Sequence, residues 1–535
     1  MIRIVAAAAL ALAAALPLGA CTRPLPPAAA IYARGADSKS LDPQAVDDGE
    51  SAKVIENIYD GLVAFGPGNT KVEPALAEKW ETSADGLQWT FHLRSGVKFH
   101  DGTPFEADAV VFTFLRFLEE KGEFHPPEVP YRPFYADHIS AVEAKDPATV
   151  VFRLKEPYAP FLANLCMFSA LIVSPSAVKG SMAGKPLSDE SRAEFGKRPV
   201  GTGAFRFQEW NAGEKKITLV RNEEYWRGPS ALARVVFITI PDNNARLSAL
   251  RAGSCNWMDQ LNMEDLAACR KDAKLKVWSA TGLNVGYVAL NTTRKPFDDV
   301  RVRRAVSLAI DRKKLVEALY FGAGKPAVHP MAPGTLGYDD ATPLPTPDRE
   351  KAKSLLAEAG FPGGFDTELY GMPNPRPYFP SPQKIAQVLK SDLAAVGIRA
   401  TINPVGEWGA YLDAVQNGKH PMCMLGWTTD NGDPDNFLTT FFAEACARPG
   451  PGALGVAFWV DPGMQDLLHR GATETEGAKR AAIYREALAL VGREVPLVPI
   501  AHAEQVFLST SGFGGFTVQP TGDLILHPVR PVAAE

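Results

Sequence analysis

Residues 74–102 read PALAEKWETSADGLQWTFHLRSGVKFHDG, and this stretch decides the fold class. Its Asp85-Gly86 dipeptide tolerates positive φ and therefore predicts a hairpin turn. Apolar and polar residues then alternate over 89–94, which is the period of a half-buried strand. The Asp-Gly-Thr-Pro sequence at 101–104 introduces a helix predicted over 107–118, because Pro is favoured at a helix start.

Strands and helices are interleaved along the rest of the chain. We predict strands over 31–33, 149–154, 205–210, 217–221, 235–240, 284–291, 495–501 and 504–508. We predict helices over 51–63, 243–252, 300–309, 312–320, 349–359, 383–396 and 478–491. The mixed order and the absence of an internal repeat favour two or three α/β lobes over a solenoid.

Length and composition limit the class of protein. A chain of 535 residues is too long for one core, and about 150 residues per domain predicts three to four domains. With 46% hydrophobic and 22% charged residues, the chain is globular. The net charge of -5 argues against nucleic-acid binding, which requires a basic face.

The N-terminus has the pattern of an export signal. Arg3 precedes the apolar run Val5–Leu18, which is too short to span a bilayer. Leu18-Gly19-Ala20-Cys21 resembles the lipobox of bacterial lipoproteins, in which the Cys carries the lipid. We therefore expect a signal peptide at 1–20, then lipidated Cys21 and a Pro/Ala-rich tether at 21–30. An ordinary secretory signal is the alternative, and no later stretch predicts a transmembrane helix.

Catalytic and metal-binding motifs are missing from the sequence. It contains no Gly-x-Ser-x-Gly, His-Glu-x-x-His, P-loop or complete dinucleotide fingerprint. The nine histidines are scattered, and no cysteines have Cys-x-x-Cys spacing. We expect no catalytic residue, no metal and no cofactor, so a binding protein is preferred to an enzyme.

A long ordered string of motifs resembles the family 5 (peptide/nickel class) extracellular solute-binding proteins of ATP-driven importers. The string comprises 74–102, Ala107–Phe112 and Gly201–Phe205. Within that family, the sequence is most similar to periplasmic dipeptide-binding proteins. Three further segments carry this likeness: Gly282–Tyr287, Met372–Tyr378 and Gly426–Phe437.

The resemblance implies an α/β fold of the periplasmic-binding-protein-like type II (cluster C) class. Two large lobes would be joined by two hinge strands, with a third, inserted domain remote from the ligand. The hinge strands would lie near Gly282–Tyr287 and Pro499–Ala503. The implied division is domain I at 31–51, 204–282 and 503–535, domain II at 52–203, and domain III at 284–501.

Two charged residues match the chemistry of a short peptide, which is a zwitterion about 7 Å long for two residues. Arg376 lies between Pro375 and Pro377, and an Arg fork binds a carboxylate through two parallel hydrogen bonds. By resemblance, Arg376 binds the peptide carboxylate and Asp430 meets its ammonium. The alternatives are a solvated surface Arg and an Asp that caps a turn.

The remaining site candidates form walls and backbone contacts. The aromatic candidates are Trp408, Trp427 and Tyr378, and the strand candidates are Gly35 and Ala36. Taken singly, each aromatic residue is as well explained as part of a core. The cysteines depart from the family, since Cys255 and Cys446 lack their expected partners, so its two disulfides are in doubt.

We therefore expect a monomeric, lipid-anchored periplasmic protein that delivers short peptides, above all dipeptides, to an ABC permease with cytoplasmic ATPases. Its contact with the membrane would be the N-terminal lipid. A different ligand on the same scaffold is the main alternative, namely a longer peptide, haem, a nickel chelate or an opine. An exported hydrolase and a murein-interacting structural lipoprotein are the alternatives from other classes.

Overall fold

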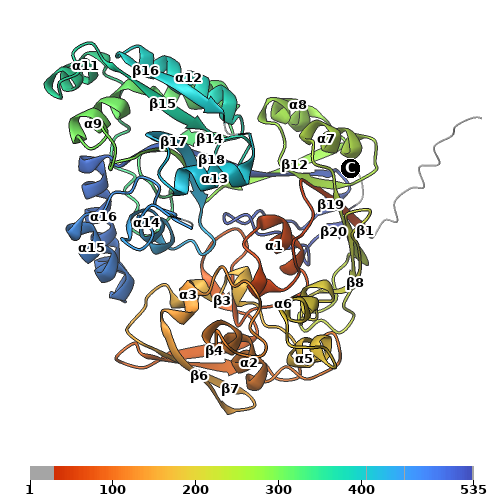
Figure 1. Ribbon diagram of the computed structural model, residues 1–535. Coiled ribbons are helices and arrows are strands. Elements are labelled where there is room, and N and C mark those ends of the chain that lie inside the picture. The colour runs from red at the N-terminus through yellow and green to blue at the C-terminus, as the bar shows by residue number, and fades with distance from the viewer. Residues whose placement is uncertain (1–28, 405, 451, 533–535) are drawn as a thin grey trace, which may run out of the picture.

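The computed structural model describes residues 29–404, 406–450 and 452–532. A mixed, 12-stranded sheet runs through the molecule (Figure 1). In spatial order its main path is β16 (Ile398–Pro404), β15 (Phe365–Gly371), β17 (Met422–Thr428), β13 (Asn284–Leu290), β18 (Leu497–Thr510), β11 (Trp257–Asp259), β1 (Ala29–Arg34), β10 (Arg234–Thr239), β9 (Lys216–Arg221) and β8 (Phe205–Asn211). Two further strands pair with β18, namely β12 (Leu275–Thr281) and β14 (Gly324–Pro326).

The 14-residue strand β18 connects the two halves of this sheet. Its first part pairs with β13 and β14, and its second part pairs with β12 and β11. Since β12 and β13 are consecutive, two chain segments cross from one half to the other at the same place. These are the segments that the sequence predicts to cross, near Gly282–Tyr287 and Pro499–Ala503.

The strand at this crossing is longer than predicted. We expected two separate strands, at 495–501 and 504–508. The structure has one strand, since His502 is buried and its Nδ1 lies 2.7 Å from the Asn284 carbonyl oxygen. The Asn284 side chain also donates to the Ala503 carbonyl and accepts from the Ala503 N–H, each at 2.9 Å.

The β13 half, built on β13 to β17, has one continuous core that draws on residues 283–503. Strand β15 is parallel to both β16 and β17. The helices of this half are α9 (Val300–Ala309), α10 (Arg312–Leu319), α11 (Arg349–Glu358), α12 (Pro382–Ala394), α13 (Trp408–Gln416), α14 (Pro434–Phe442), α15 (Pro462–Thr473) and α16 (Gly477–Glu494). All of the helices predicted in this region from the sequence are present.

The β1 half brings together three distant parts of the sequence. Strand β1 is parallel to β10 and β11, and residues from the N-terminal, middle and C-terminal segments share its cores. Ala29 and Ala30, expected in the tether, are the buried first residues of β1. The other elements are η1 (Pro43–Ala45), α1 (Gly49–Ile55), α5 (Pro175–Met182), α6 (Asp189–Ala193), η3 (Glu194–Lys197), α7 (Asn243–Arg251), η4 (Met263–Asp265), α8 (Leu266–Lys271), β19 (Phe513–Gly514) and β20 (Arg530–Pro531).

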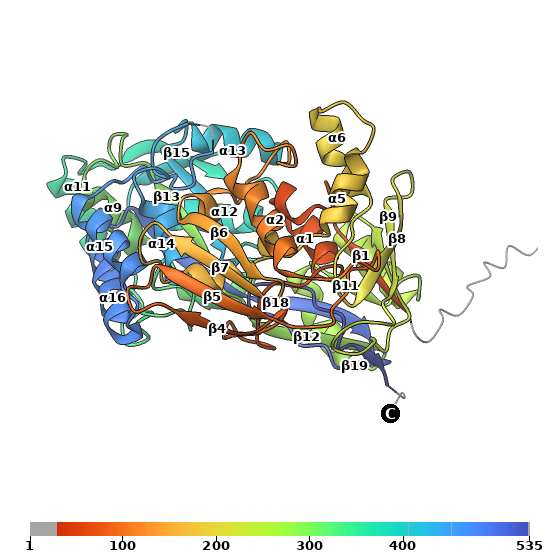
Figure 2. The ribbon, with the colours of Figure 1, turned by 90° about the horizontal axis from the view of Figure 1, so that it is seen from below.

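A third unit, the insertion, has a core of its own between Leu62 and Ile172. Its four-stranded antiparallel sheet carries the predicted hairpin at Asp85-Gly86 and lies apart from β18 in Figure 1, while Figure 2 shows its strands side by side. In spatial order the strands are β4 (Ala77–Thr82), β5 (Gln88–Leu93), β7 (Thr149–Leu154) and β6 (Ile139–Asp146). The remaining elements are β2 (Val63–Phe65), β3 (Val72–Pro74), α2 (Ala107–Leu118), α3 (Pro133–Ala136), α4 (Phe161–Asn164) and η2 (Phe168–Ala170).

Helix α1 ends earlier than predicted, at Ile55 instead of residue 63. The Asn57 amide donates to the Lys53 carbonyl and to the Leu524 carbonyl. These bonds tie the end of the helix to the C-terminal segment. The apolar residues that follow are buried in two different cores, so their helical spacing did not require a helix.

The Gly201-Thr-Gly203 motif is explained by a close backbone approach. A Cβ on Gly203 would lie 2.6 Å from the Ile58 carbonyl carbon, and one on Gly201 would lie 2.3 Å from the Ile58 oxygen. Gly203 N–H donates to the same oxygen at 2.8 Å. Both glycines therefore allow the loop after the insertion to pack against the segment that leads into it.

We expect Gly203→Ala to lower the free energy of unfolding by about 2–3 kcal/mol, because backbone atoms must move apart. The matched control is Gly180→Ala in α5, where a Cβ would meet nothing within 4 Å. That change should stabilise the protein by roughly 0.5–1 kcal/mol through helix propensity. Urea unfolding measures both, and equal stability of the two variants would contradict the explanation.

Candidate functional site

Arg376 lies in a tight loop that is firmly seated on the β13 half. Its N–H and carbonyl bond the Phe379 carbonyl and N–H at 3.1 and 2.9 Å. The Tyr378 ring packs on Gly426 of β17, where a Cβ would come within 2.3 Å of that ring. Tyr320 Oη donates to the Tyr378 carbonyl at 2.7 Å. The position of Arg376 is therefore set by several rigid neighbours.

The Arg376 guanidinium has an aromatic support and no counter-ion. Its Cζ lies 4.1 Å from the centroid of the Trp408 ring, which stacks on Tyr411. Within the described residues Arg376 forms no ion pair, and its Nε is buried without a hydrogen-bond partner. A cation held by a ring face keeps its N–H edges free. This arrangement suits a carboxylate that arrives from outside the chain.

Asp430 follows β17 and is a half-buried carboxyl group. Tyr131 of the insertion donates to Asp430 Oδ2 at 3.1 Å. Burial raises the pKa of Asp430 to about 7, the Tyr131 hydrogen bond lowers it, and Asp523 raises it again. Among the described residues no Lys or Arg pairs with Asp430. An added ammonium would supply the missing positive charge.

Asp523 lies near Asp430, and Glu56 lies near Asp523; no sequence motif marks either residue. Burial raises the pKa of Asp523 to about 6. Burial also raises the pKa of Glu56 well above its usual value, and Asp523 adds to that shift. Glu56 Oε2 accepts from the Leu524 N–H at 2.7 Å. Glu56 directly follows α1 and Asp523 belongs to the C-terminal segment, so only the fold brings them together.

Two carboxylates in the loop after Asp430, those of Asp433 and Asp435, already have partners within the protein. Asp433 forms a two-bonded ion pair with Arg480, at 2.6 and 2.7 Å, and caps α14 through the Asp435 N–H. Asp435 accepts from the Thr439 hydroxyl at 2.6 Å. Both are thus occupied within the protein, as predicted for some carboxylates of this loop.

The other predicted site residues fall into two groups. Tyr378 and Trp408 cluster with Arg376, and Trp427 lies on β17 beside Gly426, with its Nε1 donating to Asn436 Oδ1 at 2.8 Å. Gly35 and Ala36 follow β1 in the other half, where a Cβ on Gly35 would lie 2.8 Å from Gln260 Oε1. The contacts within the described residues do not join these two residues to the Arg376 cluster.

The described residues show no group of three or more His, Cys, Asp or Glu side chains arranged to hold a metal ion. Five cysteines in the same part of the chain are free thiols: Cys166, Cys255, Cys269, Cys423 and Cys446. The expected signal peptide, Cys21 and the expected tether as far as residue 28 lie outside the described residues. No described helix has both the length and the apolar character needed to cross a bilayer.

The profile of the bacterial extracellular solute-binding proteins, family 5 middle, matches residues 71–448. The chain belongs to this family. Heme-binding protein A of Haemophilus influenzae is 36% identical over 92% of this chain and 90% of its own length. The dipeptide-binding protein of Escherichia coli is 35% identical over 92% of each chain.

Solved structures agree with this assignment. A dipeptide-binding protein from a Pseudoalteromonas species, in complex with Met-Leu, has a TM-score of 0.84 and 29% identity, over 94% of this chain and all of that one. DppA of Helicobacter pylori, in complex with the peptide STSA, has a TM-score of 0.81 and 34% identity, over 94% and 98%. This family 5 protein thus has the type II periplasmic-binding-protein fold. It is an extracellular or periplasmic substrate-binding protein of an ABC importer, not an enzyme.

The unpaired state of Asp430 generates a stability prediction. Asp430→Asn should stabilise the ligand-free protein by about 2 kcal/mol above pH 7, because the raised pKa makes the ionised form unfavourable in the folded state. The stability difference between the variant and the wild type should vanish when the pH is below 3.8, the ordinary pKa of an Asp side chain. It should grow as the pH rises from there to about 7. Thermal unfolding across this pH range measures it.

Asp433→Asn is the matched control, because it breaks a buried ion pair with Arg480. It should destabilise the protein by roughly 3 kcal/mol at neutral pH. If both changes destabilise equally, Asp430 is a structural residue.

Proposed function

We propose that this protein captures short peptides, above all dipeptides, and presents them to the permease of its importer. The observation that carries the proposal is the pair of uncompensated charges, Arg376 on its Trp408 support and Asp430 beside Tyr131. A free peptide carries the complementary carboxylate and ammonium. The peptide-bound relatives support the same ligand class.

The proposed mechanism is closure of two lobes about β13 and β18. The division into domain I (31–51, 204–282 and 503–535), domain II (52–203) and domain III (284–501) remains our proposal. Its support is that the core of the insertion lies within 52–203 and the core of the β13 half covers 284–501. Core residues at 54–59 and 171–195 pack instead with the β1 half. A ligand that contacts both lobes would shift the open–closed equilibrium towards the closed form.

The anchor is also part of the proposal. We infer a signal peptide at 1–20, lipidation of Cys21 and a short tether, from the lipobox-like sequence. Because Ala29 and Ala30 lie in β1, such a tether would not extend to residue 30. The lipid would hold a monomeric binding protein near its permease and cytoplasmic ATPases.

Haem is the second candidate ligand, because the Haemophilus influenzae relative carries that name. Native mass spectrometry of the purified protein distinguishes the two candidates by the mass of any retained ligand. Titration with haem and with dialanine under the same conditions provides the direct comparison. Haem binding without peptide binding would overturn the proposal.

We expect Arg376→Ala to weaken dipeptide binding at least about 100-fold, because a two-bonded, charge-assisted contact to the carboxylate is lost. Calorimetric titration with dialanine measures the loss. The control is Arg399→Ala, which removes an exposed Arg that pairs with Asp366 in the same half. Near-native affinity of the Arg376 variant would remove this residue from the site.

Asp430→Asn should weaken free-amine dipeptides about 10-fold or more and leave N-acetylated ones little changed, because only the former carry an ammonium. For the wild type, affinity for free-amine peptides should fall as the pH drops below about 7, since Asp430 then holds a proton.

Calorimetry at pH 8 and pH 5.5, with both peptide types and both proteins, tests this role of Asp430. The variant should lose most of the pH dependence. Equal loss of both peptide types on substitution would contradict the ammonium role.

A further inference from the structure

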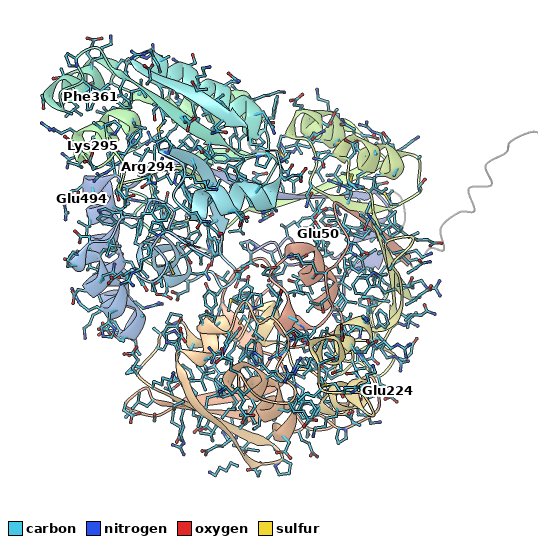
Figure 3. The ribbon with its side chains drawn as sticks, in the orientation of Figure 1. Glu50, Glu224, Arg294, Lys295, Phe361 and Glu494 are labelled. Atoms are coloured by element: carbon cyan, nitrogen blue, oxygen red, sulfur yellow. The ribbon has the colours of Figure 1, made fainter. Side chains whose placement is uncertain are left out.

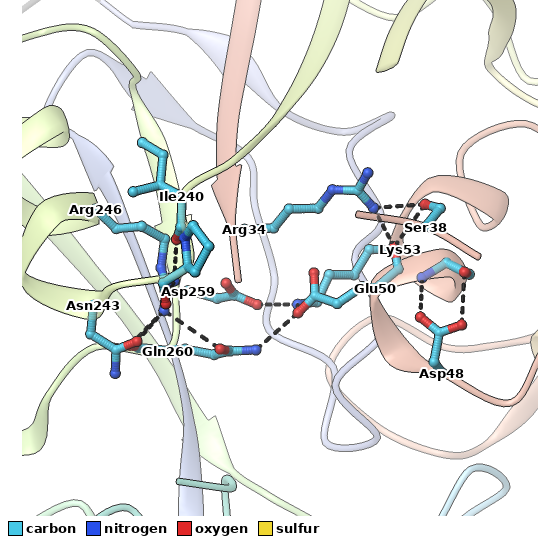
Figure 4. A network of polar contacts seen from close by, with 12 residues as sticks. Arg34, Ser38, Asp48, Glu50, Lys53, Ile240, Asn243, Arg246, Asp259 and Gln260 are labelled. Carbon is cyan, nitrogen blue, oxygen red and sulfur yellow. Dashed lines mark hydrogen bonds and ion pairs between the residues drawn. The ribbon is translucent and has the colours of Figure 1, made fainter. Parts of the chain in front are cut away.

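A network of charged side chains lies in the β1 half, where adjacent parallel strands end (Figure 4). Arg34 is the last residue of β1, Asp259 is the last of β11, and Ile240 follows β10. Ligands of α/β proteins are commonly bound at such carboxyl edges. Helix α1 brings Glu50 and Lys53 to the same edge.

Lys53 bridges two carboxylates and leaves one oxygen atom of each without a cationic partner. Its Nζ lies 2.9 Å from Glu50 Oε1 and also contacts Asp259 Oδ2. Glu50 Oε2 and Asp259 Oδ1 are buried, and neither accepts a hydrogen bond from a Lys or Arg side chain of the described residues. Asp259 is 6% exposed and Tyr32 is 0% exposed.

The Tyr32 hydroxyl lies beside the Asp259 carboxylate and donates a hydrogen bond to it. Burial raises the pKa of the Tyr32 hydroxyl, and the Asp259 and Glu50 carboxylates raise it further. Buried polar groups in native proteins nearly always have partners. The carboxylate oxygen atoms of Glu50 and Asp259 that do not contact Lys53 can therefore accept hydrogen bonds from a second cationic donor.

The charge balance favours a positive donor. The network contains the cations Arg34, Lys53 and Arg246 and the anions Asp37, Asp48, Glu50 and Asp259. Three positive against four negative groups leave one negative charge without compensation. Arg34 Nε and Arg246 Nε also lack partners, and water can supply the acceptor that each needs.

One exposed residue covers this network. Gln260 has φ +55° and donates from Nε2 to Glu50 Oε1 at 2.9 Å. Its Oε1 lies over Gly35, one of the predicted backbone contacts of the peptide. In the projection of Figure 3, Glu50 lies near the middle of the molecule, whereas Glu224 and Glu494 lie towards its edges.

A line of charges connects the network with the proposed ammonium site. Helix α1 carries Glu50 and Lys53, and Glu56 directly follows it. Lys53 acts on the pKa of Glu56, Asp523 raises the pKa of Glu56, and Asp523 also raises the pKa of Asp430. These pairwise effects form a chain from Lys53 through Glu56 and Asp523 to Asp430.

We propose that Glu50, Asp259 and Tyr32 form a subsite for the cationic side chain of a basic peptide, covered by Gln260 when that side chain is absent. The inference rests on the proposed function and names a substrate class for it, peptides that contain Lys or Arg. The ammonium or guanidinium would bridge the carboxylate oxygens that Lys53 leaves free.

Matched dipeptides test the proposal on the wild-type protein. Ala-Lys and Lys-Ala are compared by calorimetry at pH 7.5 with Ala-norleucine and norleucine-Ala, which keep the chain length and lack the charge. We expect one of the two lysyl peptides to bind at least about 10-fold more tightly than its norleucyl counterpart, because a charge-assisted hydrogen bond contributes a free energy of this size. Equal or tighter binding of both norleucyl peptides would overturn the subsite.

Substitutions test whether Asp259 and Glu50 cause the preference for lysyl over norleucyl peptides. Asp259→Asn, with Glu50→Gln as the second variant if the first does not fold, should reduce the preference below about 3-fold while norleucyl peptides bind as before. The control is Glu214→Gln, an exposed residue that pairs with Lys216. A preference that persists in the folded variants overturns the assignment to these residues. If no dipeptide binds, dialanine included, the proposed function itself fails.

Discussion

The double hydrogen bond between the Asn284 amide and the Ala503 backbone is the contact on which the architecture depends. It lies where β12 gives way to β13 and where β18 passes from one half of the sheet to the other. At this point the Asn284 side chain takes the place of regular backbone hydrogen bonds between strands. The two halves of the sheet are therefore joined by two strands and not by a broad continuous interface. A narrow two-stranded connection is what a hinge requires, because few backbone dihedrals then need to change.

This connection allows unpaired charges to persist in a stable protein. Half-buried charges without counter-ions are unfavourable. Within the described residues neither Arg376 nor Asp430 has a counter-ion, and burial raises the pKa of Asp430 to about 7, so that this carboxyl group is partly protonated at neutral pH. The cation is placed by a loop locked on Gly426 and by the Trp408 ring, and the carboxyl group is held by Tyr131. Neighbouring charges of the same loop, such as Asp433, are neutralised within the protein. Strain of this kind at a few positions on a rigid frame is typical of binding sites.

The sequence predicted the parts of this design that depend on local pattern and ordered motifs. The hairpin at Asp85-Gly86, the helix over 107–118 and the crossing near Gly282 all follow from turn chemistry, periodicity or resemblance. It missed the single strand β18, because burial of His502 outweighs its polarity. Asp523 and Tyr131 could not be predicted as neighbours of Asp430, nor Glu56 as a neighbour of Asp523, because they come from three distant segments. The role of Gly426 is likewise invisible without the Tyr378 ring that packs on it.

For the proposed peptide ligand, the charges would also specify the direction in which the zwitterion binds. Asp430, Asp523 and Glu56 gather at one place, and Lys53, the nearest cation, is already shared between Glu50 and Asp259. A peptide bound in reverse would bring its carboxylate to these acids and its ammonium to Arg376. Both ends would then meet like charge, so repulsion adds to attraction in selecting one orientation. Arg376 on a rigid loop cannot turn away to relieve this repulsion. The orientation of the peptide would therefore be set by the fixed charges of the protein. Affinity could then vary with the side chains of the peptide while its orientation stays the same.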